Sequence, residues 1–281
     1  MNTSKVKTVL ITGATSGIGF ATADGLLQEG HKIIILGRNE DRLSLAYKRL
    51  KQYHPKSDIK TLLCDLASLE SIKQASELII KDFDHLDVLI NNAGSFASSR
   101  KETQNGFEWQ FGINHLGHFY LTHLLLPLIR KSEQGRIINM SSGSHYKGKI
   151  HWNDLQLKRY RALKSYGQSK LANVLFTYEL ARRLKSTNIT VNAVDPGLVN
   201  TDMGEKDTGF LTRFIWSRRK KHGKSVEVGA SSSVFLAHNS EGGKNSGLYW
   251  KYCKAIPSSK RSYKIEDQLR LWEISSILCG I

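Results

Sequence analysis

Several features that would indicate an exported or membrane-spanning protein are scarce in this chain. Its 281 residues include three cysteines, at positions 64, 253 and 279, which are too few and too scattered for a disulfide framework or a zinc site. We therefore expect no metal and a reducing, cytoplasmic compartment. The sequence has no run of 18 or more apolar residues, so we expect no transmembrane helix. The first expected strand begins at residue 7, and we expect no signal peptide or N-terminal anchor.

Acidic residues are few relative to basic ones. The chain has 25 Asp and Glu against 41 Lys and Arg, which gives a formal net charge of +16. Such an excess raises nucleic acid, an anionic membrane or an anionic ligand as partners. The cations are spread through the chain with one dense run at 218–221, so ordinary solvated surface accounts for most of them. No pattern known for base readout is present, and we expect no nucleic-acid partner.

Internal repeats and low-complexity linkers are absent too, so a single α/β domain over residues 1–281 is the simplest interpretation. Short β-branched runs alternate with longer amphipathic stretches, the pattern of a doubly wound parallel sheet with helices on both faces. Near-continuous apolar runs such as 33–36 are typical of strands buried on both sides. The expected strands are 7–12, 32–36, 59–64, 86–91, 135–140, 188–194 and 247–251. The expected helices are roughly 17–29, 39–53, 68–83, 106–130, 163–185, 226–238 and 265–278.

One stretch, 197–224, has no regular pattern. It follows a strand end, where ligands sit in a doubly wound sheet, so we interpret it as a substrate loop or lid within the domain. Its part 211–224 has no acidic residue, and Phe214 and Trp216 are candidates to line an apolar substrate pocket. A lid packed on the core is favoured, a lid with peripheral membrane contact comes second, and nucleic-acid contact comes third.

A glycine turn follows the first expected strand. Residues 12–19 read Thr-Gly-Ala-Thr-Ser-Gly-Ile-Gly, and a strand that turns into a helix this way exposes N–H groups suited to a diphosphate. Gly13 permits the tight turn, Gly17 lets backbone approach the phosphates, and Gly19 lets the helix pack on the strand. An ordinary glycine turn is the alternative. The other cofactor-binding candidates in this turn are Thr15, Ser16 and Ile18.

The end of the second strand bears on which dinucleotide binds. Enzymes that prefer NAD usually place an acid here, whereas an arginine accommodates a 2′-phosphate. This chain has Arg38 and Asn39, and the nearest acid is Glu40. A guanidinium can pair with a phosphate and stack on the adenine. We therefore favour NADP(H) over NAD, with a merely solvated Arg38 as the alternative.

Two more strand ends carry candidate cofactor contacts. Asp65 and Leu66 close the third strand, where a carboxylate can accept from the adenine amino group; a helix cap at Asp65 explains the sequence equally well. Asn92, Ala93 and Gly94 follow the fourth strand, and their small size suits a backbone that runs close beside the cofactor. An ordinary Asn-Gly turn is the alternative for that segment.

The catalytic candidates are Tyr166 and Lys170, one helical turn apart on one helix face. An ammonium stabilises a phenolate and so brings the pKa of a tyrosine closer to neutral. The spacing alone is not specific, because Tyr47/Lys51 and Tyr160/Lys164 share it. What selects Tyr166 is the strand that ends in Ser141 and Ser142 just before it, since a serine there can donate to a carbonyl oxygen.

Taken together, these motifs resemble the short-chain dehydrogenase/reductase family, in its retinol dehydrogenase-like branch. The resemblance runs from residue 7 to the C-terminus and implies a sheet of seven parallel strands in the order 3-2-1-4-5-6-7. It also implies a dimer or tetramer. The segments that carry it are 12–19, 91–94, 114–119, 141–142, 166–173 and 195–197, with Gly247-Leu248-Tyr249 and the closing Leu271-Trp272.

The resemblance assigns a catalytic tetrad of Asn114, Ser142, Tyr166 and Lys170. Tyr166 would protonate the carbonyl oxygen during reduction or deprotonate the alcohol during oxidation, and Ser142 would hold and polarise that oxygen. Lys170 would bind the nicotinamide ribose and lower the pKa of Tyr166. Asn114 would keep a water in the proton relay.

The same resemblance places Pro196, Gly197, Val199 and Thr201 beside the nicotinamide. Relatives that act on retinol usually carry His-Pro-Gly where this chain has Asp195-Pro196-Gly197, so a contact in this region is expected to differ. The residues after Met203 follow no pattern that identifies the substrate.

The resulting hypothesis is an NADP(H)-dependent oxidoreductase that interconverts an apolar aldehyde or ketone with its alcohol by hydride transfer. A retinal-like, lipid-derived or xenobiotic carbonyl would be the substrate. The competing hypothesis is an NADPH-binding sensor or scaffold without useful catalysis, and the presence of all four tetrad residues argues against it.

Overall fold

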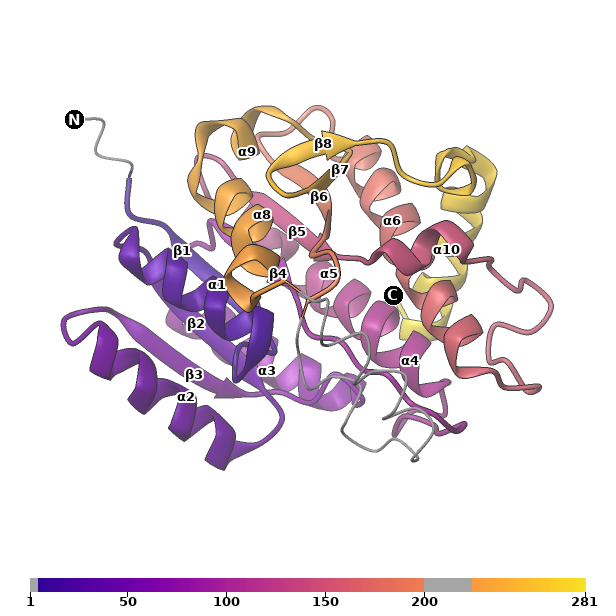
Figure 1. Ribbon diagram of the computed structural model, residues 1–281, viewed down its shortest axis with the longest axis horizontal. Helices are drawn as coiled ribbons and strands as arrows, with labels where there is room; N and C mark the ends of the chain where they lie inside the picture. Colours follow the sequence, from indigo (N-terminus) through magenta and orange to yellow (C-terminus); the bar gives the residue numbers. More distant parts are fainter. Residues whose placement is uncertain (1–4, 200–223) are drawn as a thin grey trace.

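An eight-stranded sheet organises the computed structural model, which describes residues 5–199 and 224–281. The strand order is β3-β2-β1-β4-β5-β6-β7-β8 (Figure 1). Strands β1 to β7 run parallel, and β8 pairs antiparallel with β7. The strands are β1 Thr8–Thr12, β2 Lys32–Gly37, β3 Ile59–Leu63, β4 Val88–Asn91, β5 Arg136–Met140, β6 Thr190–Asp195, β7 Leu248–Lys251 and β8 Lys254–Ile256.

The seven parallel strands and their order match the expectation, and the antiparallel β8 corrects it. A two-residue turn, Tyr252 and Cys253, joins β7 to β8, and both turn residues have positive φ, 49° and 59°. A turn this short can only return the chain antiparallel to itself. The three residues of β8 are too few for an alternating pattern to show in the sequence.

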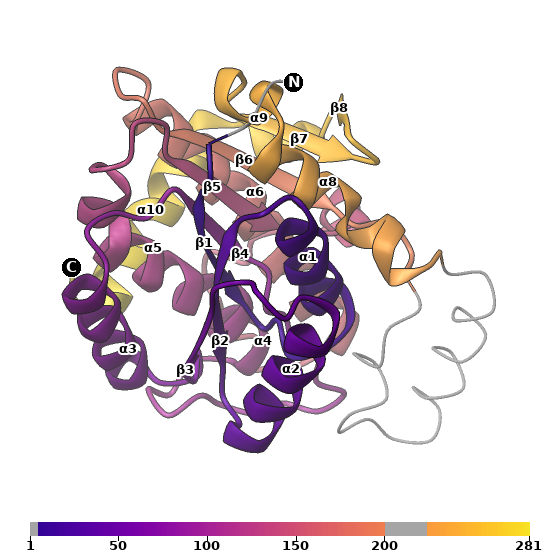
Figure 2. The same ribbon diagram turned by 90° about the vertical axis from the view of Figure 1, so that its left-hand side faces the viewer.

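Helices cover both faces of the sheet, and Figure 2 shows α1 and α2 on the opposite side from α3 and α5. In strand β1, Val9 and Ile11 join the apolar cluster beneath α1, α2 and α8, while Leu10 joins the cluster beneath α3, α5, α6 and α10. The main helices are α1 Gly17–Gln28, α2 Glu40–Tyr53, α3 Leu69–Asp82, α5 Gly117–Ile129, α6 Ala162–Arg183, α8 Val226–His238 and α10 Ile265–Cys279. Shorter ones are α4 Trp109–Phe111, η1 Gly112–Leu116, η2 Gly143–Lys147, α9 Ser240–Lys244 and η4 Lys260–Tyr263.

The expected single helix 106–130 is interrupted. It starts at Trp109 as α4, continues as the π-helical turn η1, and becomes regular again in α5. The Gly117 N–H bonds to the Gly112 carbonyl, five residues back, which is the π-helical hydrogen bond. Such a turn pushes one residue out of the regular helical repeat, and here it holds Asn114.

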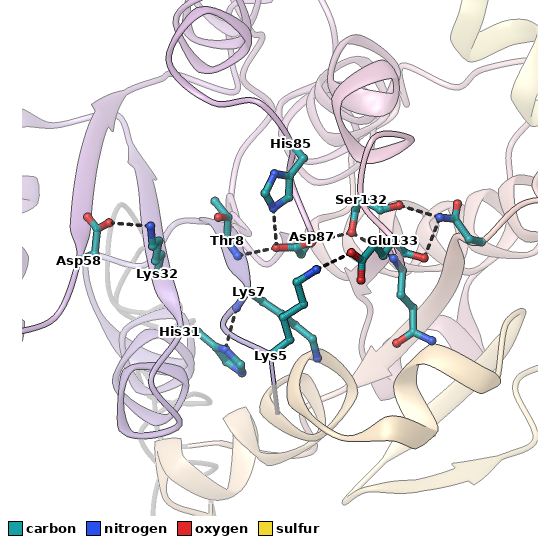
Figure 3. Close-up of polar contacts among 12 residues, drawn as sticks. Lys5, Lys7, Thr8, His31, Lys32, Asp58, His85, Asp87, Ser132 and Glu133 are labelled. Carbon is teal, nitrogen blue, oxygen red and sulfur yellow. Dashed lines mark hydrogen bonds and ion pairs between the residues drawn. The ribbon is translucent and has the colours of Figure 1, made fainter. Parts of the chain in front are cut away.

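A polar cluster lies at the amino ends of the strands, at the edge opposite the one predicted to bind the cofactor. There Lys7 Nζ donates to the carbonyls of Ala237 and His238 at 2.7 and 3.0 Å, at the C-terminal end of α8. Arg136 donates to the Ala237 carbonyl at 3.0 Å. Asp87 supplies the opposing negative charge, and Figure 3 shows it between β1 and its neighbours. These contacts hold the C-terminal end of α8 at the amino ends of the strands.

Three buried histidines predict that the fold is acid-sensitive. Burial lowers the pKa of His31 to about 4, of His115 to about 3 and of His118 to about 4. The unfolded chain binds a proton at each near pH 6.5, which the folded chain resists, so stability falls as the pH drops below 6.5.

We expect each histidine to cost about 2 kcal/mol between pH 6.5 and 5. The His115 ring packs against Phe111, Phe119 and Phe176. His115→Phe should remove the contribution of this one histidine to the pH dependence of stability. Urea unfolding at pH 7 and pH 5 measures this contribution as a change in the free energy of unfolding. An unchanged pH dependence in the variant would show that His115 is protonated in the fold.

Candidate active site

A cleft of about 700 Å³ opens at the carboxyl ends of the parallel strands. Most of the predicted site residues lie on its wall. Asn114, Ser142, Gly197 and Val199 are described but are not part of that wall, and Thr201, Phe214 and Trp216 lie outside the described residues. The predicted residues that line it are Gly13, Thr15, Ser16, Gly17, Ile18, Gly19, Arg38, Asn39, Asp65, Leu66, Asn92, Ala93, Gly94, Tyr166, Lys170 and Pro196.

The glycine turn forms one end of this cleft, at the start of α1. Gly13 and Gly17 have φ of +68° and +58°, a region that other residues rarely adopt. A Cβ on Gly19 would lie 2.4 Å from the Asn92 amide nitrogen and 2.6 Å from the Gly13 carbonyl oxygen. Ser16 is the N-cap of α1, yet its side chain makes no capping bond. The N–H groups of the first turn are therefore left available to an anion from the cleft.

Basic side chains gather where β2 ends. Arg38 is exposed, its guanidinium lies 6.0 Å from the Trp109 ring centroid, and Arg42 and Arg49 also line the cleft. Asn39 serves as the N-cap of α2, because its Oδ1 accepts from the Arg42 N–H at 2.9 Å. The cap orients the first turn of α2 and leaves the Asn39 amide nitrogen as its remaining donor.

Asp65 does not cap helix α3, which removes one of the two interpretations of this residue. Ser68, and not Asp65, is the N-cap of α3, where its hydroxyl accepts from the Ser71 N–H at 3.2 Å. Asp65 Oδ1 accepts from the Ala67 N–H at 3.0 Å within the preceding turn. Asp65 lies on the cleft wall together with Leu66, so the adenine contact stays a prediction.

The Thr12 hydroxyl ties the glycine turn to the segment after β4. It accepts from the N–H groups of Asn92 and Ala93, each at 2.9 Å, and lies 2.9 Å from His118 Nε2. His118 Nδ1 lies 3.1 Å from the Asn114 carbonyl and must carry the proton there, so Nε2 accepts from Thr12. His118 and Thr12 are not among the predicted site residues, because the contact between α5 and β1 that brings them together joins segments distant in sequence.

The Asn114 side chain projects from the π-helical turn, and both its amide oxygen and its amide nitrogen are hydrogen-bonded. Its Oδ1 accepts from the Ser95 N–H at 2.7 Å, and its Nδ2 donates to the Ser95 carbonyl and to Ser169 Oγ, both at 3.0 Å. The side chain therefore joins the loop after β4 to α6. Its expected part in a water relay stays a prediction.

Lys170 is a fully buried lysine held to the end of β5. It is 1% exposed, and its ammonium donates to the Met140 carbonyl at 3.1 Å. Asn173 donates to the same oxygen at 3.0 Å. Burial lowers the pKa of Lys170 to about 8. The negative charge of Asp195 has the opposite, smaller effect and raises this pKa. A buried ammonium facing the cleft can donate to a bound hydroxyl group.

Tyr166 lies on the same face of α6, with Lys170 Nζ 5.7 Å from its ring centroid. Phe96 packs edge-on against the phenol ring at 5.7 Å. Burial raises the pKa of Tyr166 to about 12; a hydrogen bond with Ser142 lowers it, and the charge of Asp195 raises it further. Burial is the largest cause of this shift, and the expected lowering of the pKa by Lys170 stays a prediction.

Ser142 is half-buried and begins the short helix η2. Its hydroxyl accepts from the Ser144 N–H at 3.2 Å, and its carbonyl lies 2.8 Å from His145 Nδ1. The other ring nitrogen of His145 accepts from the Ser259 N–H at 3.0 Å, so Nδ1 carries the proton and donates to Ser142. This bond fixes the backbone that presents the Ser142 hydroxyl to Tyr166.

The chain leaves β6 through Gly197 and returns at Lys224. Val199 and Lys224 form an isolated bridge, and the Lys224 N–H bonds to the Leu198 carbonyl at 2.8 Å. Tyr252 closes over this point: a Cβ on Gly197, whose φ is +77°, would lie 2.2 Å from the Tyr252 hydroxyl. The proposed substrate loop 197–224 thus has both of its ends at the rim of the cleft.

The fold and this cleft define a doubly wound α/β protein whose ligand site combines a glycine turn, an arginine cluster and a serine–tyrosine–lysine group. The short chain dehydrogenase family matches residues 7–209. The chain belongs to this family.

Comparison with individual proteins narrows the assignment to a branch of the family. Human retinol dehydrogenase 13 is 39% identical over 98% of this chain and 85% of its own length, and mouse retinol dehydrogenase 14 is 39% identical over 98% and 86%. The chain is therefore an oxidoreductase of the retinol dehydrogenase-like type. No helix among residues 5–199 and 224–281 is long and apolar enough to cross a membrane.

Solved structures agree with the fold. A protein from Mycobacterium paratuberculosis, 30% identical, superposes with a TM-score of 0.78 and covers 98% of this chain and 93% of its own. A short chain dehydrogenase from Escherichia coli, solved with NADPH, is 21% identical with a TM-score of 0.72 and covers 90% and 100%.

The Thr12 hydroxyl gives a prediction for stability. Thr12→Val removes the acceptor of the Ala93 N–H and one of two acceptors of the Asn92 N–H, which also bonds to the Ile90 carbonyl, with almost no change of shape. We expect it to cost about 1 to 3 kcal/mol. Thr22→Val is the matched control: Thr22 is equally buried but bonds only to the Ile18 carbonyl in its own helix, so the change should cost under about 1 kcal/mol. Urea unfolding of both variants measures the difference. Equal losses would contradict the role given to Thr12.

Proposed function

We propose that the protein is an NADP(H)-dependent oxidoreductase that interconverts an apolar aldehyde or ketone with its alcohol, with Tyr166 as the general acid and base. The observation that carries this proposal is the convergence of Ser142, Tyr166 and Lys170 beside the cleft that the glycine turn opens.

The cleft fits a dinucleotide. The first turn of α1, which begins at Gly17, would hold the diphosphate, since its N–H groups are not satisfied by a side-chain cap. Gly13, whose own N–H bonds to the Leu36 carbonyl at 2.8 Å, would supply the tight turn. Ala93 and Gly94 would face the nicotinamide ribose, with Lys170 as its donor. When bound, NADPH supplies the hydride. The E. coli structure with NADPH has the same fold.

The charge at the far end of the cleft favours the 2′-phosphate of NADP(H). Arg38, Arg42 and Arg49 all line that end, and a guanidinium pairs with phosphate in a bidentate way. Asp24 also lies on the wall, but its carboxylate is 2.8 Å from His54 Nε2. The arginines therefore dominate the potential there.

The chemistry at the other end is a proton transfer. The raised pKa of Tyr166 keeps its hydroxyl protonated, so it is prepared to give a proton to a carbonyl oxygen. Ser142 would donate to the same oxygen, which stabilises the negative charge that develops on it. Lys170 would hold the ribose and favour the phenolate left after the transfer.

Apolar side chains near Tyr166 support an apolar substrate. Phe96 contacts the phenol ring and lines the cleft, and the exposed Leu163 lies one turn before Tyr166 on α6. The similarity to retinol dehydrogenases makes a retinal-like aldehyde the first candidate, with lipid-derived and xenobiotic carbonyls next. We place Phe214 and Trp216 in the substrate loop, where segment 211–224 would also make any peripheral membrane contact. The cytoplasmic location and a homo-oligomer remain predictions.

The first prediction here concerns Tyr166. Tyr166→Phe should lower carbonyl reduction by at least about 1000-fold, since the proton donor is lost, while NADPH binding changes little. Tyr47→Phe is the control, because Tyr47 has the same spacing to a lysine but lies exposed on α2. NADPH absorbance with a panel of aldehydes measures turnover, and fluorescence titration measures binding. Retained turnover would remove Tyr166 from its role, and binding without turnover by the wild type would favour the sensor hypothesis.

The second prediction concerns the cofactor. Arg38→Gln should raise the KM for NADPH about 10-fold and leave the KM for NADH nearly unchanged, because only NADPH carries the phosphate that Arg38 pairs with. Steady-state kinetics with the two cofactors side by side measures this split. Equal use of both cofactors by the wild type would contradict the proposed NADP(H) preference.

A further inference from the structure

A buried carboxylate lies behind the catalytic group, at the end of β6. Asp195 is 1% exposed, and its Oδ1 accepts from the Gly197 N–H at 2.9 Å. Its Oδ2 lies 3.3 Å from Lys251 Nζ, and the carboxylate also interacts with the Tyr249 hydroxyl. The partner ammonium is partly open to water, with a third of the Lys251 side chain exposed. The negative charge of Asp195 is therefore only partly neutralised where solvent cannot screen it.

This carboxylate faces the backbone of the catalytic serine. A Cβ on Gly143, the residue after Ser142, would lie 3.5 Å from Asp195 Oδ2. Tyr249 lies next to it on β7, with its hydroxyl 3.2 Å from His145 Nδ1. Burial and the charge of Asp195 hold the pKa of Tyr249 well above its usual range, so this hydroxyl stays neutral.

The charge also reaches the catalytic pair, because Asp195 follows Val194, which pairs with Met140 in the sheet, and the Met140 carbonyl accepts from the Lys170 ammonium at 3.1 Å. Asp195 raises the pKa of Tyr166 in addition to the larger effect of burial, and it opposes the lowering of the Lys170 pKa that burial causes. Both effects have the same direction: each group keeps its proton to higher pH than it would without the carboxylate.

Within residues 5–199 and 224–281, few other charges surround these two groups. His145 is neutral at pH 7 because burial lowers its pKa, and the same holds for His118, whose neighbour is Lys170. The titratable and charged groups near Tyr166 are Lys170 on α6, His145 and Tyr146 on η2, Asp195 on β6, and Tyr249 and Lys251 on β7. At neutral pH the charged members are Asp195, Lys170 and Lys251.

We propose that Asp195 is a positioning residue that holds Lys170 as an ammonium and Tyr166 as a phenol, and thereby extends carbonyl reduction to higher pH. This rests on the proposed function. In reduction the substrate carbon receives the hydride, the carbonyl π electrons move to oxygen, and that oxygen takes the proton as the Tyr166 O–H bond breaks. The phenolate then regains a proton from solvent. Alcohol oxidation needs the phenolate at the outset, so the same fixed negative charge moves the pH range of oxidation upward as well.

The test compares two substitutions with opposite electrostatic effects. Asp195→Asn keeps the shape and the acceptor for Gly197 but removes the charge, so the alkaline limb of kcat/KM for reduction should move about one pH unit lower. We expect that limb near pH 8 in the wild type, where Lys170 loses its proton. Lys251→Gln removes the partner charge and should move the limb higher, by less because Lys251 is partly exposed.

Asp87→Asn is the matched control, since Asp87 is a carboxylate near Lys7 and Arg136 at the opposite edge of the sheet and should leave the limb in place. Thermal unfolding identifies any variant that fails to fold. Asp195 would be shown to be merely structural if Asp195→Asn and Lys251→Gln moved the limb in the same direction, or if neither moved it in folded protein.

A second readout does not depend on turnover. NMR of lysine labelled with ¹³C at Cε follows the titration of Lys170 directly, with its signal assigned from Lys170→Met. Asp195→Asn should lower that titration midpoint by about one unit and Lys251→Gln should raise it. If the wild type reduces no carbonyl, the proposed function fails while this measurement still decides the effect of Asp195. An unmoved Lys170 titration in both variants would overturn the inference.

Discussion

The carbonyl oxygen at the end of β5 holds the candidate active site together. Met140 accepts there from both the Lys170 ammonium and the Asn173 amide, at 3.1 and 3.0 Å. These two bonds join helix α6 to the sheet at the edge where the cleft opens, and they set the face of α6 that Tyr166 shares. A buried ammonium with a fixed acceptor has little freedom to move, so the catalytic pair is positioned before any ligand arrives.

Much of the architecture could be predicted because it depends on patterns that are local in sequence. The alternation of Val9, Leu10 and Ile11 between two apolar clusters follows from the two-residue period of a strand, and the order of the parallel strands followed from the family resemblance. The glycines at 13 and 17 have the positive φ that their turn requires. The cleft then forms where strand ends meet, so most of the predicted residues lie on its wall, whereas Asn114, Ser142, Gly197 and Val199 do not.

The rest depends on contacts between segments distant in sequence. The antiparallel β8 is too short to show a period, and the π-helical turn at Asn114 is stabilised by bonds to Ser95 and Ser169 that no local pattern reveals. The raised pKa of Tyr166 is a further example, because it reflects the amount of protein packed around the phenol. Sequence spacing brings an ammonium near a phenol but does not measure desolvation.

The bridge between Val199 and Lys224 has an evolutionary consequence. Because the chain departs from and rejoins the domain at adjacent positions, the sheet and the catalytic helix do not depend on what connects these two residues. The entropy of closing such a connection grows only slowly with its length. Insertions, deletions and wholesale exchange between these two points can therefore accumulate during evolution while the fold around the cleft is inherited intact.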